Sequence, residues 1–244
     1  MSPLRSYGLL VTWQALRLKT FMPLAIAVQA LFSFGIVVGY PLLFPTLDST
    51  TILYLATGAP AIALITMGLV AVPQVVAQAR TEGSLDYMRT LPIPRLVYLF
   101  ADMTVWLAIV LPGVAFAIVV AAIRFDLDLQ VSPLIVPAIL LVILTTTSIG
   151  YALASVLPQN IANLVTQVLV VFVLMFSPLN FPAERLPEWL AAVHSILPIQ
   201  PMGELIRGTL AGDVFPLRAS AFLVLGAWCV AALVLTGRVL TRRS

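Results

Sequence analysis

Charged side chains are scarce in this sequence. Asp, Glu, Lys and Arg make up 9% of its 244 residues, whereas a soluble domain usually carries about 25%. Hydrophobic residues make up 61%, and the mean hydropathy is +1.08. Folding alone cannot hide so much apolar surface from water, so the composition predicts an integral membrane protein. The net charge of +3 comes from basic residues at the ends of apolar runs, which indicates membrane orientation and no nucleic-acid partner.

Residues that carry catalysis are also scarce. Cys229 is the single cysteine and lies inside the last apolar run, which excludes an intrachain disulfide and a thiolate metal cluster. His194 is the single histidine and lacks the convergent partners that a general base or a metal site needs. No G-x-x-x-x-G-K-[ST] pattern occurs, so the chain has no P-loop for ATP. We therefore expect no catalytic residue, no metal site and no cofactor bound by this chain.

Ionisable residues are nearly absent from the apolar runs themselves. Proton and ion relays within membranes usually need several such residues, and only Asp102 qualifies. Coupling to an ion gradient therefore has little support. Because Asp102 stands near the start of its run, its carboxylate is close enough to the interface that it could reach water or Arg95.

What the sequence does contain is a series of long apolar runs without strand-like alternation. Runs of around 20 residues match the length of helices that cross a bilayer. The fold class predicted is an all-α membrane protein with six transmembrane helices in one domain, residues 1–244. The predicted spans are residues 21–44, 52–78, 96–123, 133–157, 161–180 and 219–240. A basic, loosely amphipathic segment at 3–19 precedes them, and we expect it to lie at the membrane interface.

The basic residues predict the orientation of these spans. With six spans, nine basic residues fall on the side of the termini and four on the other side. The side with more basic residues faces the cytoplasm. The nine are Arg5, Arg17, Lys19, Arg80, Arg89, Arg95, Arg238, Arg242 and Arg243; the four are Arg124, Arg185, Arg207 and Arg218. We expect a multi-pass protein of a prokaryotic plasma (inner) membrane with both termini in the cytoplasm.

A polar break separates the second span from the third. Residues 80–91 are predicted to form a short helix, which Pro92 and Pro94 end because proline lacks the N–H and crowds the preceding turn. One face of this helix would be polar and the other apolar. The polar face holds Glu82, Asp86 and Arg89; the apolar face holds Leu85, Met88 and Leu91. Such a helix suits a contact outside the membrane.

A second irregular stretch, residues 184–212, separates the fifth span from the sixth. Leu186, Leu190 and Val193 repeat at helical spacing, and Pro198 then breaks the helix. A further helix follows, and neither piece is long enough to cross about 30 Å of hydrocarbon. We expect two short helices that are re-entrant or lie on the outer surface.

Scattered polar residues occur within the spans. Those that are candidates for lining a transport path are Thr57, Thr66, Gln74, Asn163 and Gln167. Hydrogen bonds between helices are the simpler explanation, since buried polar groups need partners whether or not a substrate passes. The sequence leaves both interpretations open.

The order of these parts resembles the membrane subunits of type-2 ABC exporters. Ala79 to Arg95, A-R-T-E-G-S-L-D-Y-M-R-T-L-P-I-P-R, is similar to the family pattern E-x-G-[ST]-L-x-x-L-x-x-[ST]-P-[IV]-x-R. Phe181 to Leu190 and Leu197 to Gly208 are similar to F-P-x-x-x-[LM]-P-x-W-L followed by [NL]-P-x-x-[PY]-x-x-x-x-[IL]-R. The two motifs occur in the family's order, and the resemblance covers essentially the whole chain.

The resemblance implies that residues 80–91 form a coupling helix seated in a separate ATP-binding subunit. Its coupling residues would be Arg80, Glu82, Gly83, Ser84, Leu85, Asp86, Met88 and Arg89. It also implies a second permease subunit, alike or different, with the second and fifth spans lining the route in the lipid bilayer. Two copies of the ATP-binding subunit would hold ATP and Mg²⁺. The short outer helices would form an outer gate with Leu186, Trp189, Leu190, Glu204 and Arg207.

The function expected is ATP-driven export of a hydrophobic or amphipathic compound, a drug, antibiotic or lipid. Two alternatives stay open. One is a membrane scaffold or assembly subunit that transports nothing. The other is a lipid-modifying intramembrane enzyme, which would need a nucleophile–base pair or an acidic metal cluster within the spans.

Overall fold

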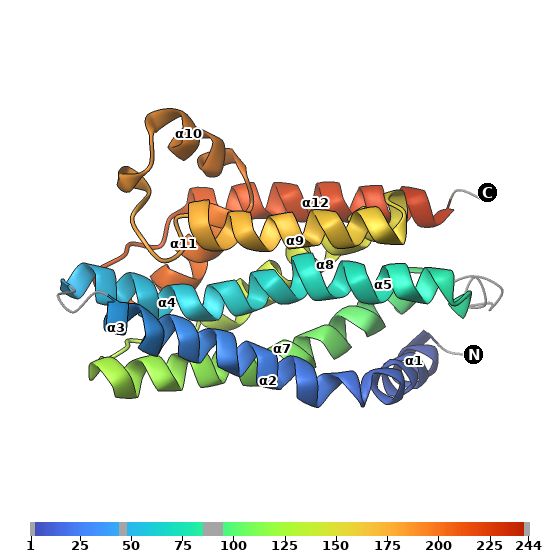
Figure 1. The fold of residues 1–244 in the computed structure, drawn as a ribbon. Coiled ribbons are helices and arrows are strands. Elements are labelled where there is room, and N and C mark those ends of the chain that lie inside the picture. The colour runs from blue at the N-terminus through green and yellow to red at the C-terminus, as the bar shows by residue number, and fades with distance from the viewer. Residues whose placement is uncertain (1–2, 44–47, 85–94, 242–244) are drawn as a thin grey trace.

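The computed structural model describes residues 3–43, 48–84 and 95–241, and these form helices joined by turns, with no strand (Figure 1). Six of the helices are long and apolar enough to cross a membrane. The six are Phe21–Leu42, Ser49–Thr81, Val97–Phe125, Ile135–Val156, Gln159–Phe176 and Ala219–Arg238. The predicted fold class, an all-α membrane protein with six such helices, is confirmed.

Several of these long helices contain π-helical turns or proline. The first consists of α2 (Phe21–Phe34), the π turn η1 (Gly35–Gly39) and α3 (Tyr40–Leu43). The second consists of α4 (Ser49–Thr66), the π turn η2 (Met67–Ala71) and α5 (Val72–Thr81). The η2 turn ends two residues before Pro73, which has no N–H to donate to the turn before it. A π turn is a common way for a helix to accommodate such an interruption.

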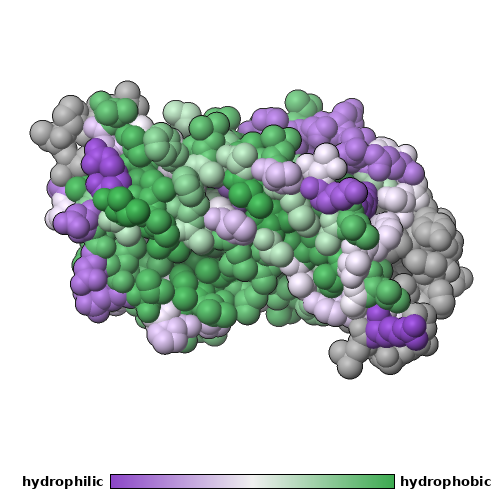
Figure 2. Space-filling view, turned by 90° about the horizontal axis from the view of Figure 1, so that it is seen from below, coloured by the Kyte–Doolittle hydropathy of each residue, from purple (hydrophilic) through white to green (hydrophobic). Residues whose placement is uncertain are grey.

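The remaining elements follow in chain order. They are α7 (Arg95–Phe125), α8 (Ile135–Val156), α9 (Gln159–Phe176), the 3₁₀ turn η3 (Ala183–Arg185), α10 (Glu188–Ile196), α11 (Ile199–Leu210) and α12 (Ala219–Thr241). The second span, α4 to α5, is the most buried, and α2, α9 and α12 expose much of their apolar surface. A hydrophobic band covers the middle of the face seen in Figure 2, and polar residues gather at its two ends. A bilayer would cover such a band.

The short helices lie at opposite ends of the bundle. Helices α10 and α11 lie toward the end where α4 and α12 begin, which we call the α11 end. Helix α1 (Pro3–Leu18), the last turn of α5 and the last turn of α12 lie at the other end, which we call the α1 end (Figure 1). Both termini of the described chain therefore lie at the α1 end.

Helix α1 packs on α7 through only one of its faces. Leu10, Gln14 and Leu18 are buried, and the Tyr7 hydroxyl lies 2.6 Å from the Thr104 hydroxyl of α7. A second apolar stripe on α1 is exposed and consists of Leu9, Trp13 and Leu16. An exposed apolar stripe on a helix beside the bundle is what a helix at the membrane interface requires.

Candidate functional site

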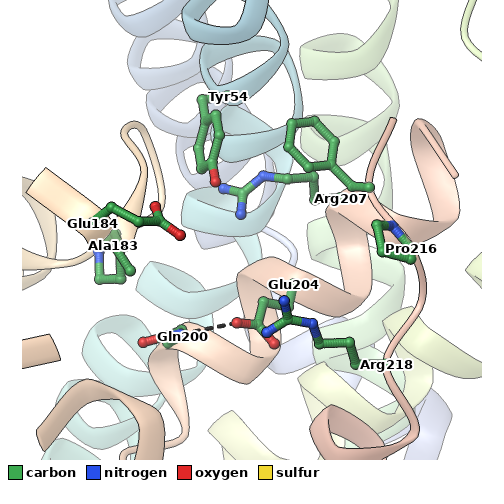
Figure 3. A pocket seen from close by; sticks show the side chains of 10 residues that line it. Tyr54, Ala183, Glu184, Gln200, Glu204, Arg207, Pro216 and Arg218 are labelled. Atoms are coloured by element: carbon green, nitrogen blue, oxygen red, sulfur yellow. Dashed lines mark hydrogen bonds between the residues drawn. The ribbon is translucent and has the colours of Figure 1, made fainter. Parts of the chain in front are cut away.

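A pocket of about 130 Å³ lies at the α11 end. Four separate segments form it: α4, the connection from α9 to α10 that includes η3, α11, and the connection from α11 to α12. Its lining residues are Tyr54, Pro178, Ala183, Glu184, Gln200, Glu204, Arg207, Phe215, Pro216 and Arg218. Figure 3 shows the side chains of Glu184, Gln200, Glu204 and Arg218 gathered around the same space as the Arg207 guanidinium.

Arg207 is the buried centre of this pocket, with 5% of its surface exposed. Its Nε donates to Thr57 Oγ1 at 3.3 Å, and its Nη2 donates to the Leu179 carbonyl at 2.7 Å. The guanidinium carbon lies 3.8 Å from the Tyr54 ring centroid and 5.4 Å from that of Phe215. These hydrogen bonds and cation–π contacts offset the cost of removing a charge from water. Burial lowers the pKa of Arg207 to about 10, so the guanidinium is charged at neutral pH.

A close backbone approach places the carbonyl that Arg207 binds. Gly58, one residue after Thr57, faces Leu179 and Asn180 directly, and a Cβ built on it would overlap the Leu179 carbonyl. Only glycine therefore lets the chain after α9 lie this close to α4. The result is that α4, the end of the fifth span and α11 are joined through one arginine.

The other charged residues of the pocket are not paired with each other. Glu204 accepts a hydrogen bond from Gln200 Nε2 at 2.9 Å, while Glu184 and Arg218 are exposed at the pocket rim. No carboxylate oxygen of Glu184 or Glu204 lies within 4.0 Å of a guanidinium nitrogen of Arg207 or Arg218. The four charged side chains therefore line the pocket without forming ion pairs across it.

A second polar cluster lies at the α1 end, around the last turn of α5. Arg80 Nη1 donates to the Ser155 carbonyl of α8 at 3.3 Å, and Gln78 Nε2 donates to Glu82 at 2.7 Å. Arg17 of α1 lies 4.0 Å from the Glu82 carboxylate. This cluster connects α1 and α8 to the end of the second span.

The helix predicted over residues 80–91 begins differently in the structure. Arg80 and Thr81 belong to α5, which is continuous with the second span, and Gly83 has a φ of +72°. This left-handed conformation, which glycine adopts without strain, ends α5 and turns the chain. The Ser84 hydroxyl then donates to the Ala79 carbonyl at 2.9 Å. The predicted coupling residues Leu85, Asp86, Met88 and Arg89 lie outside the described residues.

A lateral pocket of about 210 Å³ lies between α2, the η2–α5 part of the second span and α9. Its lining is mostly apolar and includes Gln29, Thr66, Gln74 and Val170. Gln74 Nε2 donates to Thr166 Oγ1 of α9 at 3.2 Å, and Thr66 donates to the Ile62 carbonyl of its own helix at 2.7 Å. Two of the candidate path residues, Thr66 and Gln74, are thus brought together at one pocket.

The other three candidate path residues lie elsewhere. Thr57 is buried at the α11 end and accepts from Arg207. Asn163 and Gln167 are exposed on α9, spaced so that with Val170 they follow one face of the helix toward the lateral pocket.

The predicted gate residues separate into two groups. Glu204 and Arg207 line the pocket at the α11 end. Leu190 is buried and Leu186 half-buried, whereas Trp189 is 68% exposed. Sequence reasoning did not find Tyr54, Glu184, Gln200 or Arg218. The signal for Tyr54 was present, because it stands one helical turn before Thr57 and therefore shares its face of α4.

The interpretation that the Asp102 carboxylate could reach water was wrong. Asp102 is 4% exposed, and its carboxylate accepts hydrogen bonds from the Trp106 indole, at 2.9 Å, and from the Tyr151 hydroxyl of α8. The hydrogen bond to Tyr151 joins α7 to α8 inside the bundle. The side chain of Arg95 lies outside the described residues.

Among the described residues no group of three or more His, Cys, Asp or Glu side chains could hold a metal ion. The six long apolar helices and the two polar ends define a multi-pass membrane protein. A family model for the ABC-2 type transporter matches residues 7–211, well over half of the chain. The chain therefore belongs to the ABC-2 type transporter family, as its sequence motifs indicated. Within this family the chain is the membrane-embedded permease and not the ATPase. No curated protein matches it significantly.

Proposed function

We propose that this chain is the permease subunit of an exporter that moves a hydrophobic or amphipathic compound, a drug, antibiotic or lipid, out of a prokaryotic cell. Two copies of a separate ATP-binding subunit would power it, each holding ATP and Mg²⁺, and a second permease subunit would complete the path. Membership in the ABC-2 family carries this proposal. The excess of basic residues at the α1 end supports a cytoplasmic location for both termini and for the ATP-binding subunits.

The polar cluster at the α1 end supports a role in coupling. Arg80 and Glu82 stand where the second span leaves the bundle, and they are joined to α8 and α1 through Ser155 and Arg17. A displacement of the chain after Gly83 would reach three helices at once. ATP-driven movement of a partner bound there would then shift the second span as a nearly rigid body.

The lateral pocket supports a path along the second and fifth spans. Its apolar lining suits an apolar cargo, and Gln74 and Thr66 supply a few polar groups that could orient it. The pocket opens between α2 and α9, two helices that expose much of their apolar surface. A hydrophobic compound could therefore enter from the bilayer.

The exposed amides of Asn163 and Gln167 support a second permease subunit. Both lie on an apolar helix long enough to cross the membrane, yet neither is covered by this chain. An amide without a hydrogen-bond partner in hydrocarbon costs several kcal/mol, roughly 2–7 depending on the reference state. A second subunit, or a wet path between two subunits, would remove that cost.

The proposal is tested by ATP hydrolysis. The chain is purified in detergent together with a candidate ATP-binding subunit, and hydrolysis is measured with and without the chain. We expect hydrolysis to depend on the chain and to fall in Glu82→Ala, because Glu82 stands at the proposed coupling joint. Glu188→Ala is the matched control, since Glu188 is also an exposed carboxylate but begins α10 near the α11 end. Hydrolysis that is indifferent to the chain would instead favour a scaffold subunit.

A further inference from the structure

The pocket around Arg207 has unused hydrogen-bonding capacity. Arg207 donates through Nε and Nη2, but its Nη1 makes no hydrogen bond to the described residues. Gln200 Oε1 is buried and has no hydrogen-bond partner among the described residues. A ligand in the pocket could therefore accept a hydrogen bond from Arg207, whereas Gln200 Oε1 is covered by protein atoms and Gln200 acts through its amide, which holds Glu204.

The charges of the pocket have a definite arrangement. Arg207 forms the buried floor, and Glu184 and Arg218 stand exposed at the rim, with Glu204 half-buried between them. No carboxylate of the pocket lies within 4.0 Å of either guanidinium, so the positive and negative groups form no ion pair there. The lining carries two positive and two negative side chains, which together are neutral.

We propose that this pocket binds a small zwitterionic group, in which a phosphate or carboxylate and a primary ammonium are joined by a short linker. The anionic oxygens would accept from the free N–H of Arg207 and from Arg218. The ammonium would donate to Glu204 and to Glu184. Two guanidinium groups in the lining oppose a bare metal cation, and two carboxylates oppose a bare anion.

The size of the pocket limits the occupant. Drug-sized ligands usually occupy clefts of roughly 300–1,000 Å³, whereas this pocket measures about 130 Å³. It therefore fits a small headgroup. The same chemistry is found in an ethanolamine phospholipid headgroup, held while its chains stay in the bilayer, and in a free amino zwitterion in solution. Occupancy would hold α11 against η3 and α4, the elements that line the site.

The first experiment uses the full chain in phosphatidylcholine nanodiscs and O-phosphoethanolamine as the probe, with binding measured by calorimetry. Phosphocholine is the matched control ligand, because its nitrogen carries three methyl groups and has no N–H to donate. We expect phosphoethanolamine to bind at least tenfold more tightly than phosphocholine. Equal binding of the two probes, or binding of neither, would overturn the proposal.

Variants then test the assigned residues. Glu204→Gln keeps the shape of the side chain but removes its charge, and we expect it to weaken phosphoethanolamine binding about tenfold or more. Glu184→Gln, at the exposed rim, should weaken it about two- to fivefold. Glu188→Gln is the control, since Glu188 is exposed nearby but does not line the pocket. Gel filtration and circular dichroism establish that each variant is folded. Loss of binding that is no greater in Glu204→Gln than in Glu188→Gln would contradict the assignment.

The second experiment distinguishes the two sources of the zwitterion. The chain is reconstituted with equal amounts of phosphatidylethanolamine, phosphatidylglycerol and phosphatidylcholine, and retained lipid is identified by native mass spectrometry. Preferential retention of phosphatidylethanolamine, lost in Glu204→Gln, would identify a lipid headgroup. No lipid preference together with binding of soluble phosphoethanolamine would identify a free solute. Neither readout involves ATP hydrolysis, so failure of the zwitterion proposal can be distinguished from failure of the transport proposal.

Discussion

The bond between Arg207 and Thr57 joins two segments that are 150 residues apart, and its contribution to stability can be isolated by one substitution. Thr57→Val keeps the branched shape but removes the hydroxyl, which accepts from Arg207 Nε at 3.3 Å and donates to the Leu53 carbonyl at 2.7 Å. A hydrogen bond to a charged group contributes about 1.5–3 kcal/mol. The distance of 3.3 Å is long for such a bond, so the loss should lie near 1.5 kcal/mol.

Thr66→Val separates this loss from the general effect of removing a helix hydroxyl. Thr66 belongs to the same helix and donates to the Ile62 carbonyl at 2.7 Å, as Thr57 does to Leu53, but it has no arginine partner. The difference between the two variants therefore reports the bond to Arg207. The free energy of unfolding in detergent is the measurement. Equal losses in Thr57→Val and Thr66→Val would refute the reasoning that Arg207 is held through Thr57.

Three further predictions follow from the described contacts. Gly58→Ala should lower the free energy of unfolding by about 1–3 kcal/mol, because its Cβ would meet the Leu179 backbone. Gly226→Ala is the control, since nothing lies within 4 Å of its added Cβ, and it should be neutral or stabilising; similar losses in both would be contrary to a close contact at Gly58. His194 is buried and stacks on Phe172 at 5.5 Å, and burial lowers the pKa of His194 below its ordinary value of 6.5. His194 therefore binds a proton more readily in the unfolded chain, so the stability of the folded chain should fall as the pH drops below 6.5. Thermal unfolding of His194→Leu should depend less on pH. An unchanged pH profile in this variant would argue against the prediction. Gln167→Cys, in a Cys229→Ala background, should cross-link to a second permease subunit in membranes. The control is Leu223→Cys, which is exposed on α12 and should not cross-link. The reverse pattern would exclude α9 from the contact between subunits.

The sequence predicted the membrane helices well because their signal is local. Each apolar run must satisfy its own backbone hydrogen bonds in hydrocarbon, so length and composition suffice to find it. The first and last residues of the helices differ from the predicted ones by a few positions, where a capping residue determines the end of the helix. For example, the second span begins at Ser49, behind Asp48, whose side chain accepts from the Thr51 N–H at 3.3 Å. The π turn at Met67–Ala71 was not predicted; Pro73, which follows shortly after it, cannot donate a backbone hydrogen bond to the preceding turn.

The site was harder to predict because its contacts are distant in sequence. Arg207 and Glu204 could be selected from the motif, but the partners of Arg207, Tyr54 and Thr57, lie far away in sequence on the second span. The sequence also did not predict which neighbouring helix each polar side chain of a span faces. Thr57 accepts a hydrogen bond from Arg207, and Gln74 lines the lateral pocket. Asp102 lies inside the bundle and accepts a hydrogen bond from Tyr151. Nothing in the spacing of residues along one helix determines which neighbouring helix covers each face.

The central claim is that the chain carries an apolar compound across the membrane when a partner hydrolyses ATP. The most direct measurement is uptake of a fluorescent hydrophobic cation into inside-out vesicles that contain the chain and its ATPase. The account predicts uptake that needs hydrolysable ATP, is absent when the chain is omitted, and is reduced in Glu82→Ala but not in Glu188→Ala. ATP hydrolysis that depends on the chain, accompanied by no uptake of this or of any lipid or drug probe, would contradict it.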